Sequence, residues 1–267
     1  MAGTMTAAEL RVEREGPVAT VTLDRQAQYN ALTATLLETL YKSLLELERD
    51  KEVRAIVLTG AGKGFCSGQS LDDPALAAAG NGKLDVLRAV ETRYNPLLRK
   101  MLAIEKPIVG AINGAAAGAG MGLALACDLR LASPKASFTT AFVKIGLVPD
   151  SGLSLLLPRM IGYGRAMEAI LLSEKIDAQR AYDLGIVNRI CTEESLVGDA
   201  QALAFALATG PRALGLAKRE LAHNVLGIVD EALRYEAEMQ AIAAESGDFA
   251  EGLAAFREKR PPRFTGS

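Results

Sequence analysis

Apolar positions recur along the first half of the chain with the two spacings that distinguish strands from helices. Val18 to Leu23 alternates apolar and polar residues, which predicts a half-buried strand, and the continuous apolar run 53–59 predicts a buried one. Between them, leucines at positions 32, 36, 40, 44 and 47 share one face of a helix over 31–49. Asn30 is a candidate N-cap for this helix.

Shorter elements are predicted further along the chain. In order, these are a helix over 84–103 interrupted at Pro96, strands over 128–132 and 136–138, helical pieces over 153–157 and 165–172, a helix capped by Asp177 that ends at Leu184, a strand over 186–190, and a helix capped by Thr192 that runs to Thr209. Three more helices follow Pro211, over 213–225, 229–245 and 248–259. Strands and helices therefore mix up to about residue 205, and the rest is a helical tail that we expect to dock or to oligomerise.

The stretch KPIVGAINGAAAGAGMGLALACD, residues 106–128, carries charge only at its two ends. It predicts a short strand to Ile112, a turn at Asn113-Gly114, and a buried helix over 123–127 behind closely spaced glycines. Such glycines let the backbone approach a ligand, and the helix N-terminus can stabilise an oxygen on which negative charge develops. Close packing of small residues is the alternative. A membrane span is a poor match, because the stretch holds Pro, Asn and five glycines.

Composition excludes several classes of function. The chain has 267 residues, 49% hydrophobic and 23% charged, and a net charge of −2, so neither a nucleic-acid surface nor a membrane surface is indicated. The three cysteines, Cys66, Cys127 and Cys191, have no metal-ligand or redox spacing, and we expect reduced core cysteines in a cytoplasmic protein. With His223 as the single histidine, expected on a helix surface, a His-rich metal site is excluded.

The loop GAGKGFCSGQSLDD, residues 60–73, is rich in glycine but lacks the spacing of a phosphate-binding P-loop. The small and polar stretch Asp73 to Gly82 at its end is expected to be mobile.

Five sequence blocks together resemble the crotonase, or enoyl-CoA hydratase/isomerase, superfamily. They are LDRQAQYNAL at 23–32, VLTGAGKGFCSGQSL at 57–71, KPIVGAINGAAAGAGMGLALACDLRLAS at 106–133, GLVPDSG at 146–152 and EGLAAFREKRPPRFTG at 251–266. Each block is weak by itself, but the five occur in family order over nearly the whole chain.

The resemblance implies an α/β fold, a spiral of repeated strand-strand-helix turns closed by a helical region that builds trimers. It divides the chain into an acyl-CoA-binding spiral core, 1–205, and a C-terminal oligomerisation region, 206–267. The expected partners are an acyl-CoA substrate and further copies of the chain, as a trimer or a dimer of trimers, and the expected location is cytoplasmic. No metal and no redox cofactor are implied, because an enolate held by N–H donors needs neither.

The family holds the thioester oxygen with two backbone N–H groups, and by position these belong to Gln69 and Ala119. Family members usually have Gly at the second position. The resemblance further assigns substrate or CoA contacts, to Arg25 at the CoA phosphates, to Ser67, Gly68, Gln69 and Leu71 in the loop, and to Phe256 and Lys259 over the CoA of an adjacent subunit. For Arg25 and Lys259, a solvated surface charge is the alternative.

Hydratases of this family use two glutamates, and here their positions hold Gly122 and Phe142. A two-carboxylate hydration mechanism is therefore not expected. Asp150 remains, at a position where several isomerases of the family carry an acid that moves a proton between two carbons. Turn formation or helix capping in Pro149-Asp150-Ser151-Gly152 is its structural alternative. The resemblance favours a catalytic Asp150 whose pKa is raised by apolar neighbours at 142, 145, 147 and 148.

A narrower resemblance involves the ring-epoxide isomerases of bacterial phenylacetate breakdown. It is carried by GFCSGQSL, RYNPLLRK at 93–100, AFVKIGLVPDSG and KRPPRFTG, and it implies conversion of ring-1,2-epoxyphenylacetyl-CoA to oxepin-CoA. Ser70 and Leu153 depart from that pattern, and Leu153 is expected to reshape the pocket wall beside Asp150. The alternatives are another enoyl-CoA isomerase or hydratase of the fold, a dehalogenase, or a non-catalytic acyl-CoA-binding protein. Tyr94 is a candidate for the acyl pocket, although a core aromatic is the more ordinary role.

Overall fold

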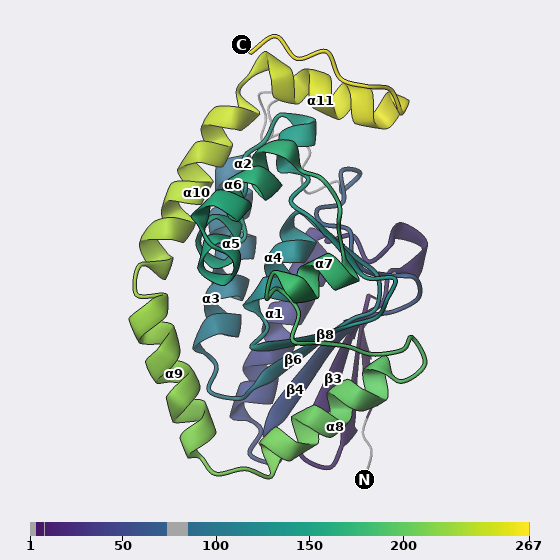
Figure 1. The fold of residues 1–267 in the computed structure, drawn as a ribbon, viewed down its shortest axis with the longest axis vertical. Coiled ribbons are helices and arrows are strands. Elements are labelled where there is room, and N and C mark those ends of the chain that lie inside the picture. The colour runs from purple at the N-terminus through teal and green to yellow at the C-terminus, as the bar shows by residue number, and fades with distance from the viewer. Residues whose placement is uncertain (1–3, 8, 74–84, 267) are drawn as a thin grey trace.

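The computed structural model describes residues 4–7, 9–73 and 85–266, which form two β-sheets surrounded by helices (Figure 1). The larger sheet has the order β1-β2-β3-β4-β6-β8-β11, and the smaller one the order β10-β9-β7-β5. The strands are β1 (Thr4–Ala7), β2 (Leu10–Glu15), β3 (Val18–Leu23), β4 (Ala55–Gly60), β5 (Gly64–Cys66), β6 (Ile108–Ile112), β7 (Ala115–Ala117), β8 (Leu129–Ala132), β9 (Ser137–Thr139), β10 (Ile176–Asp177) and β11 (Arg189–Ile190).

Successive turns of the chain each add one strand to the larger sheet and one to the smaller. The pairs β4 and β5, β6 and β7, and β8 and β9 follow this rule, and their like members pair in parallel within each sheet. Helices follow the first two pairs, which confirms the predicted spiral of strand-strand-helix turns. The helices are α1 (Ala34–Arg49), α2 (Val86–Ala89), α3 (Asn95–Ala103), α4 (Ala119–Ala126), α5 (Leu153–Ile161), α6 (Tyr163–Leu172), α7 (Ala178–Asp183), α8 (Leu196–Ala208), α9 (Ala213–Val225), α10 (Val229–Ala244) and α11 (Gly247–Glu258).

Apolar side chains fill both sides of the larger sheet. One face packs against α1, α3 and α4, whereas the other face packs against α8, which crosses it in Figure 1. Because α8 contributes Ala200 and Ala204 to the second core, β3 is buried along its whole length. The half-buried strand predicted over 18–23 is thus wrong: its alternation did not reveal that a helix covers the second face.

The bounds of the C-terminal helices agree closely with the ranges predicted from the sequence. Figure 1 shows α9 and α10 along one side of the molecule, with α10 beside α2 and α5, and α11 across the end. The predicted range 213–225 is matched by α9, and α10 and α11 agree within one residue at each end. No helix among the described residues is long and apolar enough to cross a membrane, and 106–128 folds into β6, β7 and α4 instead.

Two predicted N-caps are wrong, because both residues lie before the helix that they were expected to cap. Helix α1 begins after Thr33, whose hydroxyl accepts from the Leu36 amide at 3.0 Å. Asn30 instead has a left-handed backbone with φ of 57°, and its side-chain amide donates to the carbonyl oxygens of Ala61 and Gly64. The side chain thus joins two loops, which a sequence pattern does not reveal. In the same way α8 begins after Ser195, while the Thr192 hydroxyl accepts from the Ser195 amide in the preceding turn.

Other boundaries also differ from the pattern. Residues 86–103 form one helical run in which a π-helical segment, Val90–Tyr94, precedes Pro96, so the wider turn accommodates the proline without an interruption. The strand predicted over 186–190 shortens to β11. The N-terminal strands β1 and β2 were not predicted. Of the stretch 73–82 expected to be mobile, Asp73 accepts from the Ala34 amide at 2.7 Å, and residues 74–82 lie outside the described part.

Candidate active site

The loop after β5 presents the first of the two expected backbone donors. Gly68 has φ of +90°, and a Cβ there would lie 2.7 Å from the Ala117 carbonyl oxygen and 3.6 Å from the Ala119 nitrogen. The loop is held on its other side, because the Leu32 amide donates to the Gly68 oxygen and the Ser70 amide donates to the Leu32 oxygen. Only glycine fits so close an approach, and it brings the Gln69 segment beside the start of α4.

Helix α4 begins at the second expected donor. Gly118 precedes it with φ of 52°, and Ala119 is the first helical residue and is buried. Among the described residues, neither the Gln69 nor the Ala119 amide N–H donates a hydrogen bond to the protein. The two donors therefore lie close together without acceptors, at a helix N-terminus that favours negative charge. This arrangement can bind an oxyanion.

Gly122, one turn further along α4, faces the turn that carries Asp150. A Cβ at Gly122 would lie 2.6 Å from the Ser151 carbonyl oxygen and 2.7 Å from the Ser151 Cβ. No side chain fits at this position, which the resemblance assigns to a glutamate in hydratases. The second such position, Phe142, is buried and lies against Gly118.

Asp150 is buried and bound through both carboxyl oxygens. The Ser151 hydroxyl donates to Oδ1 at 2.8 Å, and the Gln240 amide donates to Oδ2 at 2.7 Å. Burial raises the pKa of Asp150 from 3.8 to about 6, although the two hydrogen bonds lower it. A carboxyl group with this pKa can accept and return a proton near neutral pH.

Two polar residues of α10 support the Asp150 turn, and sequence reasoning missed both. Glu236 accepts from the amides of Gly152 and Ser154 at 2.8 and 2.9 Å, and from the Ser154 hydroxyl at 2.6 Å. Burial raises the pKa of Glu236 to about 7. Glu236 and Gln240 are spaced i, i+4 on the buried face of α10, which also carries Leu233 and Ala237. Two polar residues on an otherwise apolar helical stripe were the signal available in the sequence.

Tyr94 binds the loop that carries Gln69, here called the oxyanion loop. It is buried, and its hydroxyl donates to the Gln69 side-chain oxygen. Burial raises the pKa of Tyr94, and the negative charge of Asp150 raises it further. A series of contacts thus links Tyr94, Gln69, the start of α4 and the Asp150 turn.

The residues expected at the CoA moiety are more dispersed. Arg25 pairs with Glu9 at 2.9 Å and donates to the Ala31 carbonyl oxygen, so its guanidinium is engaged within the protein. In the loop, Ser67 is exposed and Leu71 is half-buried. Phe256 and Lys259, at the end of α11, are exposed.

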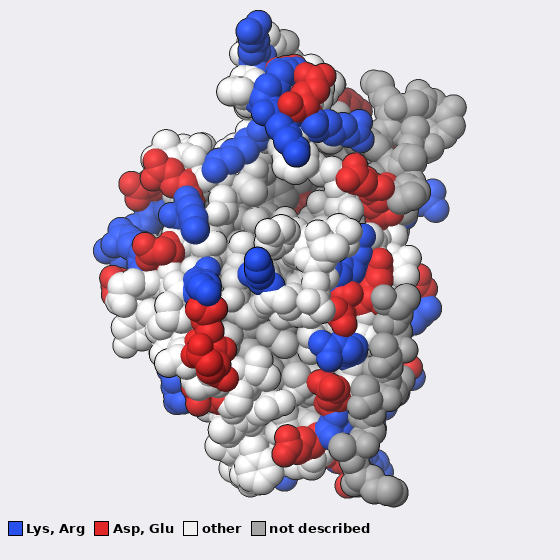
Figure 2. Space-filling model, turned by 90° about the vertical axis from the view of Figure 1, so that its right-hand side faces the viewer, with Lys and Arg blue, Asp and Glu red and all other residues white. Residues whose placement is uncertain are grey.

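Basic side chains gather at the end of the molecule where α11 lies. In Figure 2, Lys and Arg crowd the upper end of the face shown, and the surface below them is hollowed. The exposed basic residues of this segment are Arg257, Lys259 and Arg263. The first half of α11 packs against residues 145 and 146 of its own chain, where Gly252 lies against Ile145 and Gly146 lies against Asp248.

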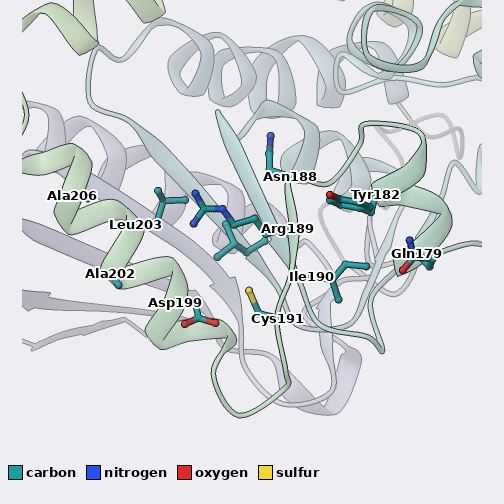
Figure 3. A pocket seen from close by; sticks show the side chains of 11 residues that line it. Gln179, Tyr182, Asn188, Arg189, Ile190, Cys191, Asp199, Ala202, Leu203 and Ala206 are labelled. Carbon is teal, nitrogen blue, oxygen red and sulfur yellow. The ribbon is translucent and has the colours of Figure 1, made fainter.

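A separate surface cavity of about 830 Å³ lies between β11, α7 and α8 (Figure 3). Tyr182, Asn188, Cys191 and Asp199 are among the residues that line it. Cys191 is half-buried there, which corrects its expected place in the core, whereas Cys66 and Cys127 are buried as expected. None of the residues that the sequence indicates for acyl-CoA chemistry lines this cavity. His223, as expected, is exposed on α9.

Comparison with known proteins gives matches over nearly the full chain. The sequence profile of the enoyl-CoA hydratase/isomerase family matches residues 13–267. A 1,2-epoxyphenylacetyl-CoA isomerase of Escherichia coli is 41% identical over 253 residues, covering 94% of this chain and 96% of that protein. A probable enoyl-CoA hydratase of Rhodobacter capsulatus is 42% identical over 258 residues, covering 96% and 98%.

Solved structures show the same fold. The crystal structure of an enoyl-CoA hydratase from Mycobacterium avium subsp. paratuberculosis has a TM-score of 0.86 and 33% identity, covering 97% of this chain and 100% of that one.

A third named activity occurs among the sequence relatives. A 4-chlorobenzoyl coenzyme A dehalogenase of Arthrobacter is 35% identical, covering 94% of this chain and 91% of that protein.

Proposed function

Because the chain belongs to the enoyl-CoA hydratase/isomerase family, we propose that this acyl-CoA enzyme is an isomerase that uses Asp150 to move a proton. The observation that carries the proposal is the buried carboxyl group of Asp150, with a pKa of about 6, on a turn that packs against α4. The N-terminus of α4 and the neighbouring loop supply two backbone amides, of Ala119 and Gln69, that have no acceptor in the described part of the chain. The two positions that the hydration mechanism would need as carboxylates hold Gly122 and Phe142.

The reaction begins with the thioester oxygen bound by the N–H groups of Gln69 and Ala119. Asp150, as carboxylate, takes a proton from the carbon next to the thioester of a 3-enoyl-CoA, and the electron pair moves into a dienolate on that oxygen. Asp150 then returns the proton two carbons further along the chain, which gives the 2-enoyl-CoA and restores the carboxylate. One such amide donor contributes about 3–4 kcal/mol to the transition state.

Three observations support isomerisation over hydration. Gly122 has no space for a side chain, and Phe142 is apolar. Glu236 is a buried acid, but both of its oxygens are occupied by donors of the α5 N-terminus. A water molecule therefore lacks the second carboxylate that would orient it. Dehalogenation would need Asp150 as nucleophile with His and Trp side chains beside it. It is not supported either, because the chain has no Trp and His223 is exposed on α9.

The narrower substrate proposal is ring-1,2-epoxyphenylacetyl-CoA, converted to oxepin-CoA in phenylacetate catabolism. It is supported by the 41% identity to the isomerase of that name in Escherichia coli and by the sequence blocks around Gln69 and Asp150. We include in the proposal a homotrimer or a dimer of trimers, built by residues 206–267, in which Phe256 and Lys259 close over the CoA of a neighbouring copy. Arg25 would then exchange Glu9 for a CoA phosphate.

The test is an isomerisation assay with purified protein on trans-3-enoyl-CoA and on ring-1,2-epoxyphenylacetyl-CoA. Asp150→Asn is measured in parallel, together with CoA binding. Conversion that the variant loses, with binding retained, supports the proton shuttle, and the faster substrate identifies the acyl group. Full turnover by Asp150→Asn would exclude Asp150 as the base. Binding without conversion of either substrate would favour the non-catalytic alternative.

A further inference from the structure

Helix α10 holds the Asp150 turn through two side chains with different targets. Glu236 binds backbone, namely the amides of Gly152 and Ser154 at the start of α5. Gln240 binds the reactive side chain itself, through its amide nitrogen and Asp150 Oδ2 at 2.7 Å. Gln240 is 1% exposed, so this contact takes place away from water.

The orientation of the Gln240 amide is fixed by a second contact. Its side-chain oxygen accepts from the Val148 backbone amide at 3.3 Å, on the same turn as Asp150. Since a backbone N–H can only donate, the oxygen must face Val148 and the NH₂ group must face Asp150. Gln240 is therefore a donor to Asp150, and it bridges two points of the turn.

The turn needs such a support, because its backbone is unusual. Ser151 has φ of 56° and Gly152 has φ of 75°, so two successive residues after Asp150 are left-handed, and the first is not glycine. Strained conformations of this kind persist only where surrounding contacts determine them. The turn lies against α4 on one side, at Gly122, and against α10 on the other.

We propose that Gln240 is a positioning residue that holds Asp150 ionised and in one orientation for proton transfer. The inference rests on the proposed function, in which Asp150 is the shuttle. An amide NH₂ has no lone pair to offer, so it binds the carboxylate form better than the protonated one. The Ser151 hydroxyl on Oδ1 can either donate or accept, and thus serves both states of Asp150 during the reaction.

The groups around Asp150 define how this inference can be measured. The titratable groups that interact with it are Glu236 on α10 and Tyr94 before α3. Among the described residues, no hydrogen bond joins Gln240 to either of these side chains. A change at residue 240 that alters the pH dependence of the reaction therefore acts through Asp150.

The experiment compares kcat/KM for trans-3-enoyl-CoA across pH in wild type, Gln240→Met and Gln240→Glu. Gln240→Met keeps the length of the side chain and removes the donor. We expect the acidic limb to move up by about one pH unit, which is about a tenfold loss of rate on that limb. Gln240→Glu keeps the shape and the acceptor for Val148 but sets a carboxylate against Asp150, so we expect an upward shift at least as large.

Gln201→Met is the matched control. Gln201 lies on α8 and donates to the Thr20 hydroxyl at 3.0 Å, so the variant loses a comparable hydrogen bond far from the Asp150 turn. Its acidic limb should coincide with that of wild type. Circular dichroism and thermal midpoints establish which variants are folded. If Gln240→Met does not fold, the isosteric Gln240→Glu decides whether Gln240 positions Asp150.

The outcomes separate this inference from the proposed function. If Asp150→Asn is inactive and the folded residue-240 variants keep the wild-type limb, Gln240 does not position Asp150 and only this inference is wrong. If Asp150→Asn retains full turnover, the proposed shuttle is wrong and the inference fails with it. A limb that also moves in Gln201→Met would show a general loss of packing and would overturn the assignment.

Discussion

Replacement of Asp150 by asparagine should make the protein more stable at pH 8 while it removes the reaction. The side chain is buried, and burial raises its pKa from 3.8 to about 6. Folding therefore favours the protonated form, so the stability present below about pH 4 is lost as the pH rises through about 6. At pH 8 the native protein carries the cost of a buried carboxylate.

The size of this cost follows from the pKa. One pKa unit corresponds to about 1.4 kcal/mol, so the rise to about 6 places an upper limit of about 3 kcal/mol on the gain in Asp150→Asn. Asparagine can keep both contacts, because its oxygen can accept from Gln240 and its NH₂ group can donate to the Ser151 hydroxyl. Glu236, whose pKa is also raised, titrates in both proteins. Most of its contribution therefore cancels in the difference.

Urea unfolding of both proteins between pH 4 and pH 8 measures this difference. We expect the two free energies of unfolding to be similar at pH 4 and to diverge up to about pH 6–7, with no further change above it. Turnover should fall by about 10²–10⁴-fold, the range for loss of a general base. Glu238→Gln, an exposed carboxylate on α10, is the control and should change neither quantity. Equal stability of Asp150→Asn and wild type at pH 8 would refute the reasoning.

Three further changes test the site. Gly68→Ala should lower kcat by about 10²–10³-fold, because it displaces the amide of the oxyanion loop. Gly16→Ala is the control, since Gly16 also has a positive φ but a Cβ there would meet nothing within 4 Å. Equal kcat values of the two variants in steady-state assays would contradict this. Gly122→Glu should lower the free energy of unfolding by about 3 kcal/mol or more, because the new side chain meets Ser151, and it should not create hydratase activity. Urea unfolding measures the stability, and an assay of 2-enoyl-CoA hydration measures the activity. Tyr94→Phe should lower kcat/KM by about tenfold, as one hydrogen bond to the oxyanion loop is lost, and unchanged kinetics would remove Tyr94 from the site.

The sequence predicted those elements whose signals are local. Helix α7 was predicted at its cap, because Asp177 accepts from the Arg180 amide three residues later. The three C-terminal helices have breaks at Gly and Pro that mark their ends. The five sequence blocks then indicated the fold, which no pattern of hydrophobic residues would have specified alone.

Contacts between distant segments were not predictable in the same way. Glu236 and Gln240 reach the Asp150 turn from the other end of the chain, and a polar residue in a helix is ordinarily expected at the surface. Asp73 likewise accepts from the Ala34 amide at the start of α1, although the sequence placed it only in a loop. Such long-range hydrogen bonds depend on the packing of whole helices, which local spacing does not encode.

Gly122, at the position that the resemblance assigns to a hydratase glutamate, and Asp150 are parts of one packing arrangement. Because residue 122 is glycine, the Ser151 carbonyl and Cβ can lie against α4, and the left-handed Ser151 then directs its hydroxyl to Asp150. A glutamate at position 122 would displace the same turn that presents Asp150. The two carboxylate positions therefore exclude one another in this backbone, so a change toward hydration would require residues 122 and 151 to change together.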